Sequence, residues 1–121
     1  SENIAVTAII GRFLEHGRIY VFANKGKFQS ESNLVYIASA DMMPRNLYHR
    51  VEAFIPLENK TVRSQILDQV LPALINDTKN TWQLNKHGEY SKIDNKDKSF
   101  CAHTYFMKNP SLSGQGSLAK I

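Results

Sequence analysis

A short apolar run, Ile19-Tyr20-Val21-Phe22, limits the folds open to this chain more than any other segment. Its β-branched and aromatic residues fit a pleated, half-buried surface, so it predicts a strand over residues 18–22. Side chains two residues apart in a strand lie on the same face. We therefore expect the imidazole of His16 and the guanidinium of Arg18 to lie side by side where this strand begins.

This pair of side chains favours chemistry on phosphate groups. An imidazole acts as nucleophile, acid or base near neutral pH, and a guanidinium is a permanent cation that binds phosphate oxygens through two parallel hydrogen bonds. We take His16 as the candidate catalytic residue and both His16 and Arg18 as phosphate ligands. The alternative is that His16 is an ordinary histidine with a backbone hydrogen bond.

The segment from Ser39 to Asn46 follows another predicted strand and adds groups of the same kind. The Ser39 hydroxyl can donate to a phosphate oxygen, Arg45 can neutralise one, and Asn46 can orient either phosphate or imidazole. Asp41 suits a supporting role, in which it holds the imidazole or an arginine in place or helps to hold a metal ion.

Arg50 and Glu52 stand two residues apart in a further predicted strand, so they share a face. They form either a phosphate contact with its supporting carboxylate or an exposed ion pair of little energetic value. The residue pattern leaves both interpretations open.

The periodicity of the remaining chain predicts both strands and helix. Strands are expected over residues 4–10, 18–22, 34–38 and 50–55, with a polar hairpin loop at 24–33. A helix is expected after the N-cap candidate Asn59, and Pro72 should kink or restart it before Asn76. A small hairpin is expected over 81–84 and 90–93, and order weakens after Asp94. This pattern indicates an α/β fold, with α+β as the alternative, in a single domain.

Composition narrows the setting of the protein. The 121 residues carry a net charge of +4, which indicates a mild preference for polyanions. Cys101 is the only cysteine, so no internal disulfide forms, and we expect a reducing, cytoplasmic setting. No apolar run approaches the ~20 residues of a membrane span, and no signal peptide is recognisable. Because the sequence starts without Met, we expect a piece of a longer protein.

Two motifs carry a resemblance to a known family. The stretch Ile9-Ile10-Gly11-Arg12-Phe13-Leu14-Glu15-His16-Gly17-Arg18-Ile19-Tyr20 resembles the C-terminal domain of bacterial polyphosphate kinase, the ATP–polyphosphate phosphotransferase. So does Tyr36-Ile37-Ala38-Ser39-Ala40-Asp41-Met42-Met43-Pro44-Arg45-Asn46-Leu47, with Arg50-Val51-Glu52 after it. That domain is similar to phospholipase D: its His-x-Arg stands where phospholipase D has His-x-Lys, and Ser39 stands at the position of the downstream Gly-Ser.

The resemblance implies a fold and an extent. The expected architecture is a phospholipase-D-like mixed sheet with a long packing helix and a small C-terminal hairpin. The domain is expected over residues 1–110, with a flexible tail at 111–121, as a fragment of a longer enzyme.

The resemblance also implies an activity. The family transfers the terminal phosphate of ATP reversibly to polyphosphate through a phosphohistidine, with Mg²⁺. The position of His16 matches the second histidine of the family, whereas the phosphorylated histidine lies in a preceding domain. We therefore expect Mg²⁺ to be bound mainly by residues outside this fragment, and the isolated fragment to be inactive. The expected partners are ATP or ADP, polyphosphate, the rest of the enzyme and, at full length, further copies of it in a homo-oligomer. The expected location is cytoplasmic, or peripheral at the membrane.

Two other functions are alternatives. A phospholipase-D-like phosphodiesterase or nuclease needs an aspartate about five residues after the lysine, and this chain has Ala23 there. A non-catalytic polyanion-binding module would use the basic loops, but the sequence lacks the interleaved aromatic and basic residues that stack nucleic-acid bases, so no nucleic-acid partner is expected.

Overall fold

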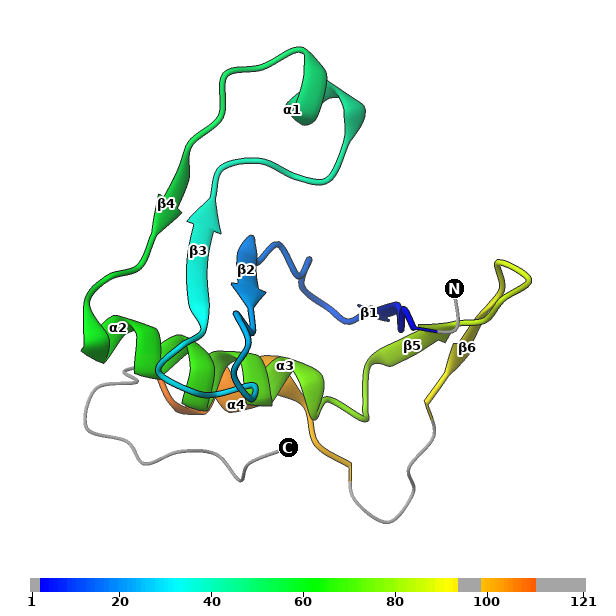
Figure 1. Ribbon diagram of the computed structural model, residues 1–121. Helices are drawn as coiled ribbons and strands as arrows, with labels where there is room; N and C mark the ends of the chain where they lie inside the picture. The colour runs from blue at the N-terminus through cyan, green and yellow to red at the C-terminus, as the bar shows by residue number, and fades with distance from the viewer. Residues whose placement is uncertain (1–2, 94–98, 111–121) are drawn as a thin grey trace. The chain divides into compact units, whose positions relative to one another are not determined.

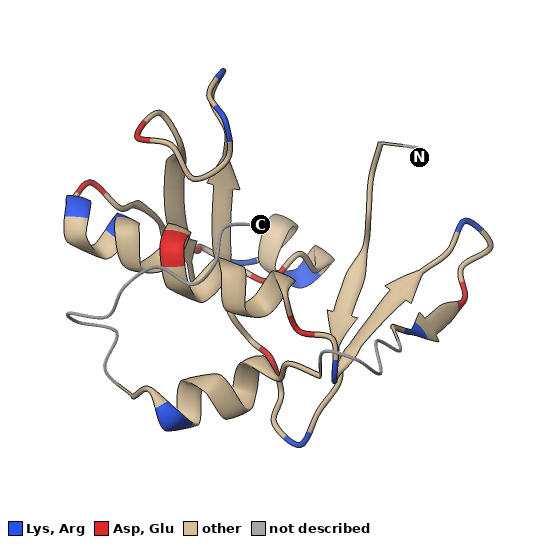
Figure 2. Cartoon of the chain, turned by 90° about the horizontal axis from the view of Figure 1, so that it is seen from below, with Lys and Arg blue, Asp and Glu red and all other residues tan. Residues whose placement is uncertain are grey.

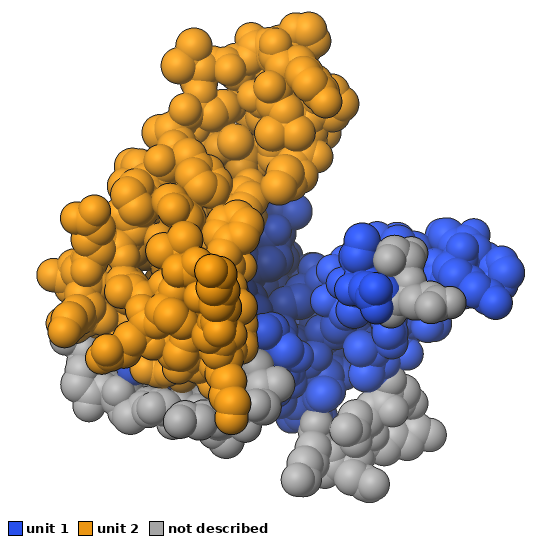
Figure 3. Space-filling view, in the orientation of Figure 1, with its two compact units in different colours: residues 1–15, 69–121 blue, residues 16–68 orange. Residues whose placement is uncertain are grey.

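A computed structural model describes residues 3–93 and 99–110 of the chain. The chain divides into two compact units (Figure 3): unit 2 comprises residues 16–68, and unit 1 comprises residues 1–15 together with 69–121. The expected tail at 111–121 lies outside the described residues. None of the helices in the described ranges has the length and apolar character that a membrane crossing requires.

Unit 2 contains an antiparallel sheet of three strands (Figure 1), β2 (Ile19–Phe22), β3 (Leu34–Ala38) and β4 (Phe54–Pro56), in the order β2-β3-β4. Tyr20 pairs with Tyr36, and Tyr36 with Pro56. On the opposite face of β3, Val35 is 2% exposed and belongs to the buried core. The strand predicted at 34–38 is confirmed, and that at 18–22 begins one residue later than expected.

The strand expected over 50–55 is wrong in its first half, since β4 begins at Phe54. The Ala53 N–H donates to the side-chain Oγ of Ser39 at 3.0 Å, while the Ser39 N–H donates to the Ala53 carbonyl at 3.0 Å. The Ser39 side chain thus takes the place of a backbone carbonyl as acceptor for Ala53, and the regular pairing of β3 with β4 stops at this point. The strand expected to end at residue 55 extends to Pro56, which an edge strand tolerates.

The connection between β2 and β3 is tightly built. Asn24 and Lys25 have φ of 48° and 64°, and the Gly26 N–H donates to the Ala23 carbonyl at 3.0 Å, as in a type I′ turn. Asn33 is buried, and its Nδ2 donates to the carbonyls of Ala23 and Lys27 and to Ser30 Oγ. The loop expected at 24–33 is therefore folded around one asparagine side chain.

A helical segment follows β4: α2 (Lys60–Gln65), a π-helical turn η1 (Ile66–Val70) and α3 (Leu71–Ile75). The side chain of Asn59 accepts from the Val62 N–H at 3.2 Å, which confirms the predicted N-cap. Pro72 stands in the first turn of α3, so the helix restarts there as predicted. Pro72 has no N–H to give to a preceding carbonyl, and the Leu67 carbonyl accepts instead from Gln29 Nε2 at 2.9 Å.

Unit 1 contains a second antiparallel sheet, β1 (Thr7–Ile9), β5 (Thr81–Leu84) and β6 (Tyr90–Lys92), in the order β1-β5-β6. The predicted C-terminal hairpin is confirmed, whereas the strand expected over 4–10 is shorter. A further helix, α4 (Ala102–Lys108), was not expected. The buried carboxylate of Asp77 accepts from the N–H groups of Ala102 and Asn80 at 2.8 and 2.7 Å, which ties the start of α4 to the turn before β5.

The class of the fold, mixed helix and strand, is confirmed. The described strands form two antiparallel sheets where one mixed sheet was expected. Each sheet contains one hairpin, β2-β3 or β5-β6, which pairs antiparallel, and the third strand of each sheet adds to it in the antiparallel sense as well.

Candidate functional site

His16 and Arg18 lie immediately before β2, within unit 2. The Ala38 N–H donates to the Arg18 carbonyl at 3.0 Å, which continues the pairing of β2 with β3 by one residue. The two side chains meet, with 2.7 Å between Arg18 Nη2 and His16 Nε2. The structure thus places the imidazole and the guanidinium side by side, as the alternation of the sequence predicts.

Asp41 joins this pair from the loop after β3. Arg18 donates to both carboxylate oxygens, from Nε to Oδ1 at 2.8 Å and from Nη2 to Oδ2 at 3.3 Å. His16 Nε2 lies 2.8 Å from Oδ1. Of the roles considered for Asp41, the structure therefore shows contact with both the imidazole and an arginine.

His16 Nε2 lies within hydrogen-bond distance of both Asp41 and Arg18. A protonated Nε2 donates to Asp41, whereas an unprotonated Nε2 accepts from Arg18, and one nitrogen cannot do both. Gain or loss of one proton therefore changes which neighbour the imidazole prefers. This suits a group that passes a proton or a hydrogen bond to a third partner.

Electrostatics hold the carboxylate in its ionised form. The hydrogen bond from Arg18, followed by that with His16, lowers the pKa of Asp41 to about 2. The hydrogen bond to Asp41 likewise raises the pKa of Arg18, partial burial opposes this, and the charges of Asp41 and Glu52 add to the increase. The cluster is open to solvent, since the side chains of His16, Arg18 and Asp41 are 51%, 29% and 21% exposed.

A second carboxylate, Glu52, organises the other predicted ligands. The Ser39 hydroxyl donates to Glu52 Oε2, and Asn46 Nδ2 donates to Oε1 at 2.7 Å. These bonds, with the Ser39 bond first, lower the pKa of Glu52, and the charges of Arg50 and Arg18 act in the same direction. Glu52 therefore supports the site from within, and Ser39 and Asn46 already have an anionic partner.

The local sequence explains how Asn46 reaches Glu52. The loop expected over 39–46 ends in a short helix, α1 (Pro44–Tyr48), with Pro44 in its first turn, where a missing N–H costs nothing. Asn46 is the buried residue of this helix. Its Oδ1 is buried without a hydrogen-bond partner among the described residues, so this amide has one acceptor unused.

Arg45 and Arg50 are exposed at the surface of unit 2. Neither side chain makes a hydrogen bond or ion pair within residues 3–93 and 99–110, although the charge of Arg50 acts on Glu52. Of the two alternatives for Arg50 and Glu52, a direct ion pair is thus not what the structure shows. Both guanidinium groups are available to an anion from solution.

Sequence reasoning missed Tyr20. Its hydroxyl donates to the Ala40 carbonyl at 3.2 Å, next to Asp41, and so helps to fix the loop that carries the carboxylate. The sequence pattern could have identified Tyr20, because this residue continues the alternation of His16 and Arg18 along the same face of the strand.

The residues of this site do not form a metal centre. The described residues contain no group of three or more histidine, cysteine, aspartate or glutamate side chains placed to hold a metal ion. Asp41 and Glu52 are instead committed to nitrogen and hydroxyl donors. The donor set of this unit therefore fits an anion better than Mg²⁺.

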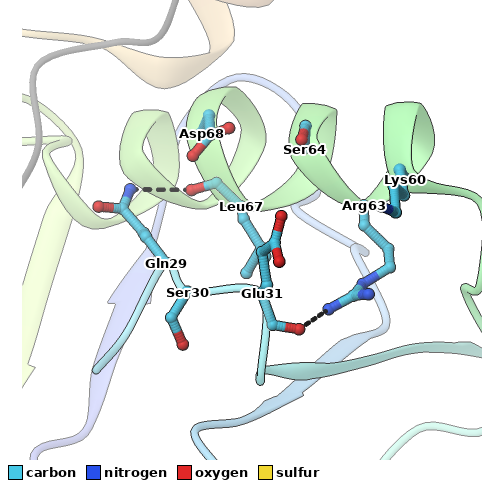
Figure 4. Close-up of a pocket in the computed structure, with 8 residues that line it drawn as sticks. All are labelled: Gln29, Ser30, Glu31, Lys60, Arg63, Ser64, Leu67 and Asp68. Atoms are coloured by element: carbon cyan, nitrogen blue, oxygen red, sulfur yellow. Dashed lines mark hydrogen bonds between the residues drawn. The ribbon is translucent and has the colours of Figure 1, made fainter. Parts of the chain in front are cut away.

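A separate pocket of about 510 Å³ lies between α2 and the loop 29–31 of unit 2 (Figure 4). Its lining is Gln29, Ser30, Glu31, Lys60, Arg63, Ser64, Leu67 and Asp68. Arg63 Nη2 donates to the carbonyls of Glu31 and Asn33 at 2.8 and 2.6 Å, so this arginine is used to hold the loop. Glu31 and Asp68 offset the charges of Lys60 and Arg63 in this lining, and Arg63 already holds the loop, so the pocket offers little cationic charge to a polyanion.

Charged residues elsewhere do not gather by sign. Figure 2 shows lysine and arginine positions distributed over both units and interspersed with aspartate and glutamate positions. This distribution gives no support to a module that binds polyanions through one basic surface.

Comparison with known proteins places these features in a family. Residues 1–103 match the family described as polyphosphate kinase C-terminal domain 2. A polyphosphate kinase of Erythrobacter litoralis is 53% identical over 116 residues, which make up 96% of this chain and 16% of that protein. A polyphosphate kinase of Helicobacter pylori is 40% identical over 108 residues, or 89% of this chain and 15% of that protein.

A crystal structure of polyphosphate kinase from Porphyromonas gingivalis has a similar fold, with a TM-score of 0.77 and 32% identity over 90% of this chain. The match covers 16% of that chain. The present chain therefore spans a small part of the length of the relatives that it matches.

Proposed function

Because this chain belongs to the polyphosphate kinase family through its C-terminal domain 2, we propose that it supplies part of the active site of an enzyme that transfers the terminal phosphate of ATP to polyphosphate and back. The observation that carries the proposal is the contact of 2.7 Å between Arg18 Nη2 and His16 Nε2, with Asp41 bonded to both side chains. The substrates are ATP or ADP and polyphosphate.

Arginine side chains supply the positive charge that binds the phosphates. Each phosphate of the polymer carries negative charge, and these charges repel one another strongly where the dielectric is reduced. Arg18 uses Nε and Nη2 for its contacts with Asp41 and His16, so the N–H groups of Nη1 remain to bind a phosphate while the arginine is still bonded to Asp41. Arg45 and Arg50 add two permanent cations in the same unit.

His16 acts on the phosphoryl group in transfer. A protonated Nε2 that leaves Asp41 can donate to a phosphate oxygen or to the departing group. General acid catalysis of this kind contributes roughly 10²–10⁴-fold to the rate. The nucleophilic histidine belongs to the part of the enzyme outside this chain.

Asp41 and Glu52 are positioning residues in this scheme. Asp41 fixes the imidazole and guanidinium, and Glu52 fixes Ser39 and Asn46. The single hydroxyl hydrogen of Ser39 goes to Glu52, so Ser39 binds phosphate only by exchanging Glu52 for a substrate oxygen. Asn46 keeps a second N–H on Nδ2 for the substrate.

Several wider features complete the proposal. The domain comprises residues 1–110, works with the rest of a polyphosphate kinase chain in a cytoplasmic homo-oligomer, and by itself does not catalyse transfer. Mg²⁺, which would neutralise nucleotide phosphates, is held by residues outside this chain, in keeping with the donor set described above.

The test is the substitution His16→Ala in the polyphosphate kinase that contains this chain. We expect ATP-dependent polyphosphate synthesis to fall by about 10²-fold or more, in line with the loss of a general acid. His87→Ala is the matched control, because His87 is an exposed histidine in the β5–β6 turn of unit 1. Turnover above about a tenth of the wild-type value would refute the role of His16.

A further inference from the structure

The pocket between α2 and the loop 29–31 of unit 2, which we call the α2 pocket, takes no part in the function proposed above (Figure 4). Its volume of about 510 Å³ lies within the usual range of small-molecule sites, about 300–1,000 Å³. The π-helical turn η1 contributes Leu67 and Asp68 to its wall, and π-helical turns within helices are frequent at functional sites. The α2 pocket is therefore a candidate ligand site.

Two hydrogen bonds hold the walls of the α2 pocket together. Gln29 Nε2 donates to the Leu67 carbonyl at 2.9 Å, and Arg63 Nη2 donates to the Glu31 carbonyl at 2.8 Å (Figure 4). The loop is thus fastened to the helical segment on both sides of the pocket before any ligand arrives. A preformed site of this kind saves a ligand part of the cost of ordering its binding groups.

The charged side chains of the α2 pocket are separated by sign along the helical segment. Lys60 and Arg63 lie at one end and Asp68 lies at the other, as Figure 4 shows, with Glu31 between them. At about 1.5 Å of rise per residue, Lys60 and Asp68 are separated by roughly 12 Å along the helix axis. The pocket thus has a cationic end and an anionic end.

The protein itself leaves these charges largely unused. In the part of the chain that the structure describes, the side chains of Lys60, Glu31 and Asp68 make no hydrogen bond or ion pair. Arg63 gives Nη2 to the carbonyls of Glu31 and Asn33, which leaves its other N–H groups. Both ends of the pocket can therefore attract a group of opposite charge from solution.

The order of the charges selects the class of ligand. A nucleotide or polyphosphate would bring anionic groups against Glu31 and Asp68, and a polyamine would bring an ammonium group against Lys60. A ligand with a carboxylate at one end and an ammonium group at the other meets opposite charges at both ends. Between the ends, Glu31 can accept from amide N–H groups and the Ser64 hydroxyl can donate to a carbonyl. A short peptide with free termini has all of these groups.

We propose that the α2 pocket binds a short peptide with free termini, with its carboxylate at Lys60 and Arg63 and its ammonium group at Asp68. A tripeptide has a suitable length, because three extended residues span about 10 Å and the side chains at either end reach the rest of the distance. This binding goes beyond the phosphate transfer proposed above and does not depend on it.

The test is isothermal titration calorimetry of the full-length polyphosphate kinase that contains this chain, with triglycine as the probe. We expect saturable binding with a Kd of about 100 μM or lower. N-acetyl-triglycine lacks the ammonium group and triglycine amide lacks the carboxylate. Each should bind about tenfold more weakly than triglycine, because each loses a hydrogen bond between charged groups.

Substitutions in the enzyme should reproduce these losses one end at a time. Asp68→Asn should weaken the binding of triglycine by about tenfold and leave that of N-acetyl-triglycine unchanged. Lys60→Gln should weaken the binding of triglycine and leave that of triglycine amide unchanged. Lys86→Gln is the matched control, because Lys86 is an exposed lysine in the β5–β6 turn of unit 1.

Several results would overturn the inference. They are the absence of saturable triglycine binding up to about 1 mM, equal binding of triglycine and both capped peptides to the unsubstituted enzyme, equal effects of Lys60→Gln and Lys86→Gln, and displacement of triglycine by ATP. ATP-dependent polyphosphate synthesis is measured in parallel without peptide. Loss of that activity would bear on the proposed function alone, whereas the peptide titrations bear on the α2 pocket alone.

Discussion

The guanidinium of Arg18 donates to both carboxylate oxygens of Asp41, from Nε at 2.8 Å and from Nη2 at 3.3 Å. An aspartate thus occupies one edge of the group that we propose binds phosphate. This internal anion keeps the arginine ordered before substrate arrives. It also means that the strength of the Arg18–Asp41 pair affects both stability and binding.

Asp41→Asn is expected to remove a pH-dependent part of the stability. The pKa of Asp41 falls from 3.8 in the unfolded chain to about 2 in the folded protein, so its contribution is fully present above pH 3.8 and is lost as the pH falls towards 2. The difference in free energy of unfolding between wild type and variant should be constant at neutral pH and shrink in this acid window. Urea unfolding at a series of pH values measures it. A difference that stays constant down to pH 2 would contradict the ionic role of Asp41.

Arg18→Lys tests the geometry of the guanidinium at constant charge. A lysine ammonium cannot span Asp41 and a phosphate with two parallel hydrogen bonds. In the full-length enzyme we expect kcat/KM for ATP to fall by about 10²–10³-fold, as when a positioned donor is removed from other active sites. Arg12→Lys is the control, because it makes the same substitution at an exposed arginine outside the His16 site. The Arg12 guanidinium lies 5.8 Å from the centre of the Phe13 ring. Equal effects of the two substitutions would count against a special role for Arg18.

Asn46→Asp places a second carboxylate against Glu52, where Asn46 Nδ2 now donates to Oε1 at 2.7 Å. Two ionised carboxylates at this distance repel, so the variant should unfold at a lower temperature than wild type at pH 7. The loss should become smaller near pH 4, because one protonated carboxyl can then donate to the other. Asn59→Asp serves as control, since aspartate is also a good N-cap for α2.

Gln29 combines a left-handed backbone, with φ of 63°, and a hydrogen bond to the Leu67 carbonyl at 2.9 Å. Gln29→Ala should lower the free energy of unfolding by about 1 kcal/mol through loss of this bond. Gln29→Gly loses the same bond but relieves the left-handed conformation, so it should be more stable than the alanine variant by about 1 kcal/mol. Chemical denaturation of the two variants in parallel measures the difference. A glycine variant no more stable than the alanine variant would show that φ at position 29 carries no strain.

The sequence pattern predicted the parts of unit 2 that depend on local periodicity. The strand at 34–38 is a clean apolar run bounded by polar segments, and the alternation of His16 and Arg18 placed their side chains together. The N-cap at Asn59 and the restart at Pro72 follow from local chemistry as well.

Other features depend on contacts between distant residues and were not predictable in detail. The choice of Asp41 for Arg18 and His16 was one of several roles that the sequence allowed. The bond from the Ala53 N–H to Ser39 Oγ replaced a strand pairing that the alternation of residues 50–55 favours. The helix α4 was missed because its start depends on the buried carboxylate of Asp77, far away in the sequence.

The asparagine at the centre of the β2–β3 connection makes the fold of this loop depend on the chemistry of a single side-chain amide. Nδ2 of Asn33 lies 3.1, 2.9 and 3.1 Å from three oxygen acceptors, those of Ala23, Lys27 and Ser30. Hydrolysis of this one amide to aspartate would remove both donor hydrogens and turn a negative oxygen towards those acceptors. Loss of this one amide would thus undo the connection from its interior.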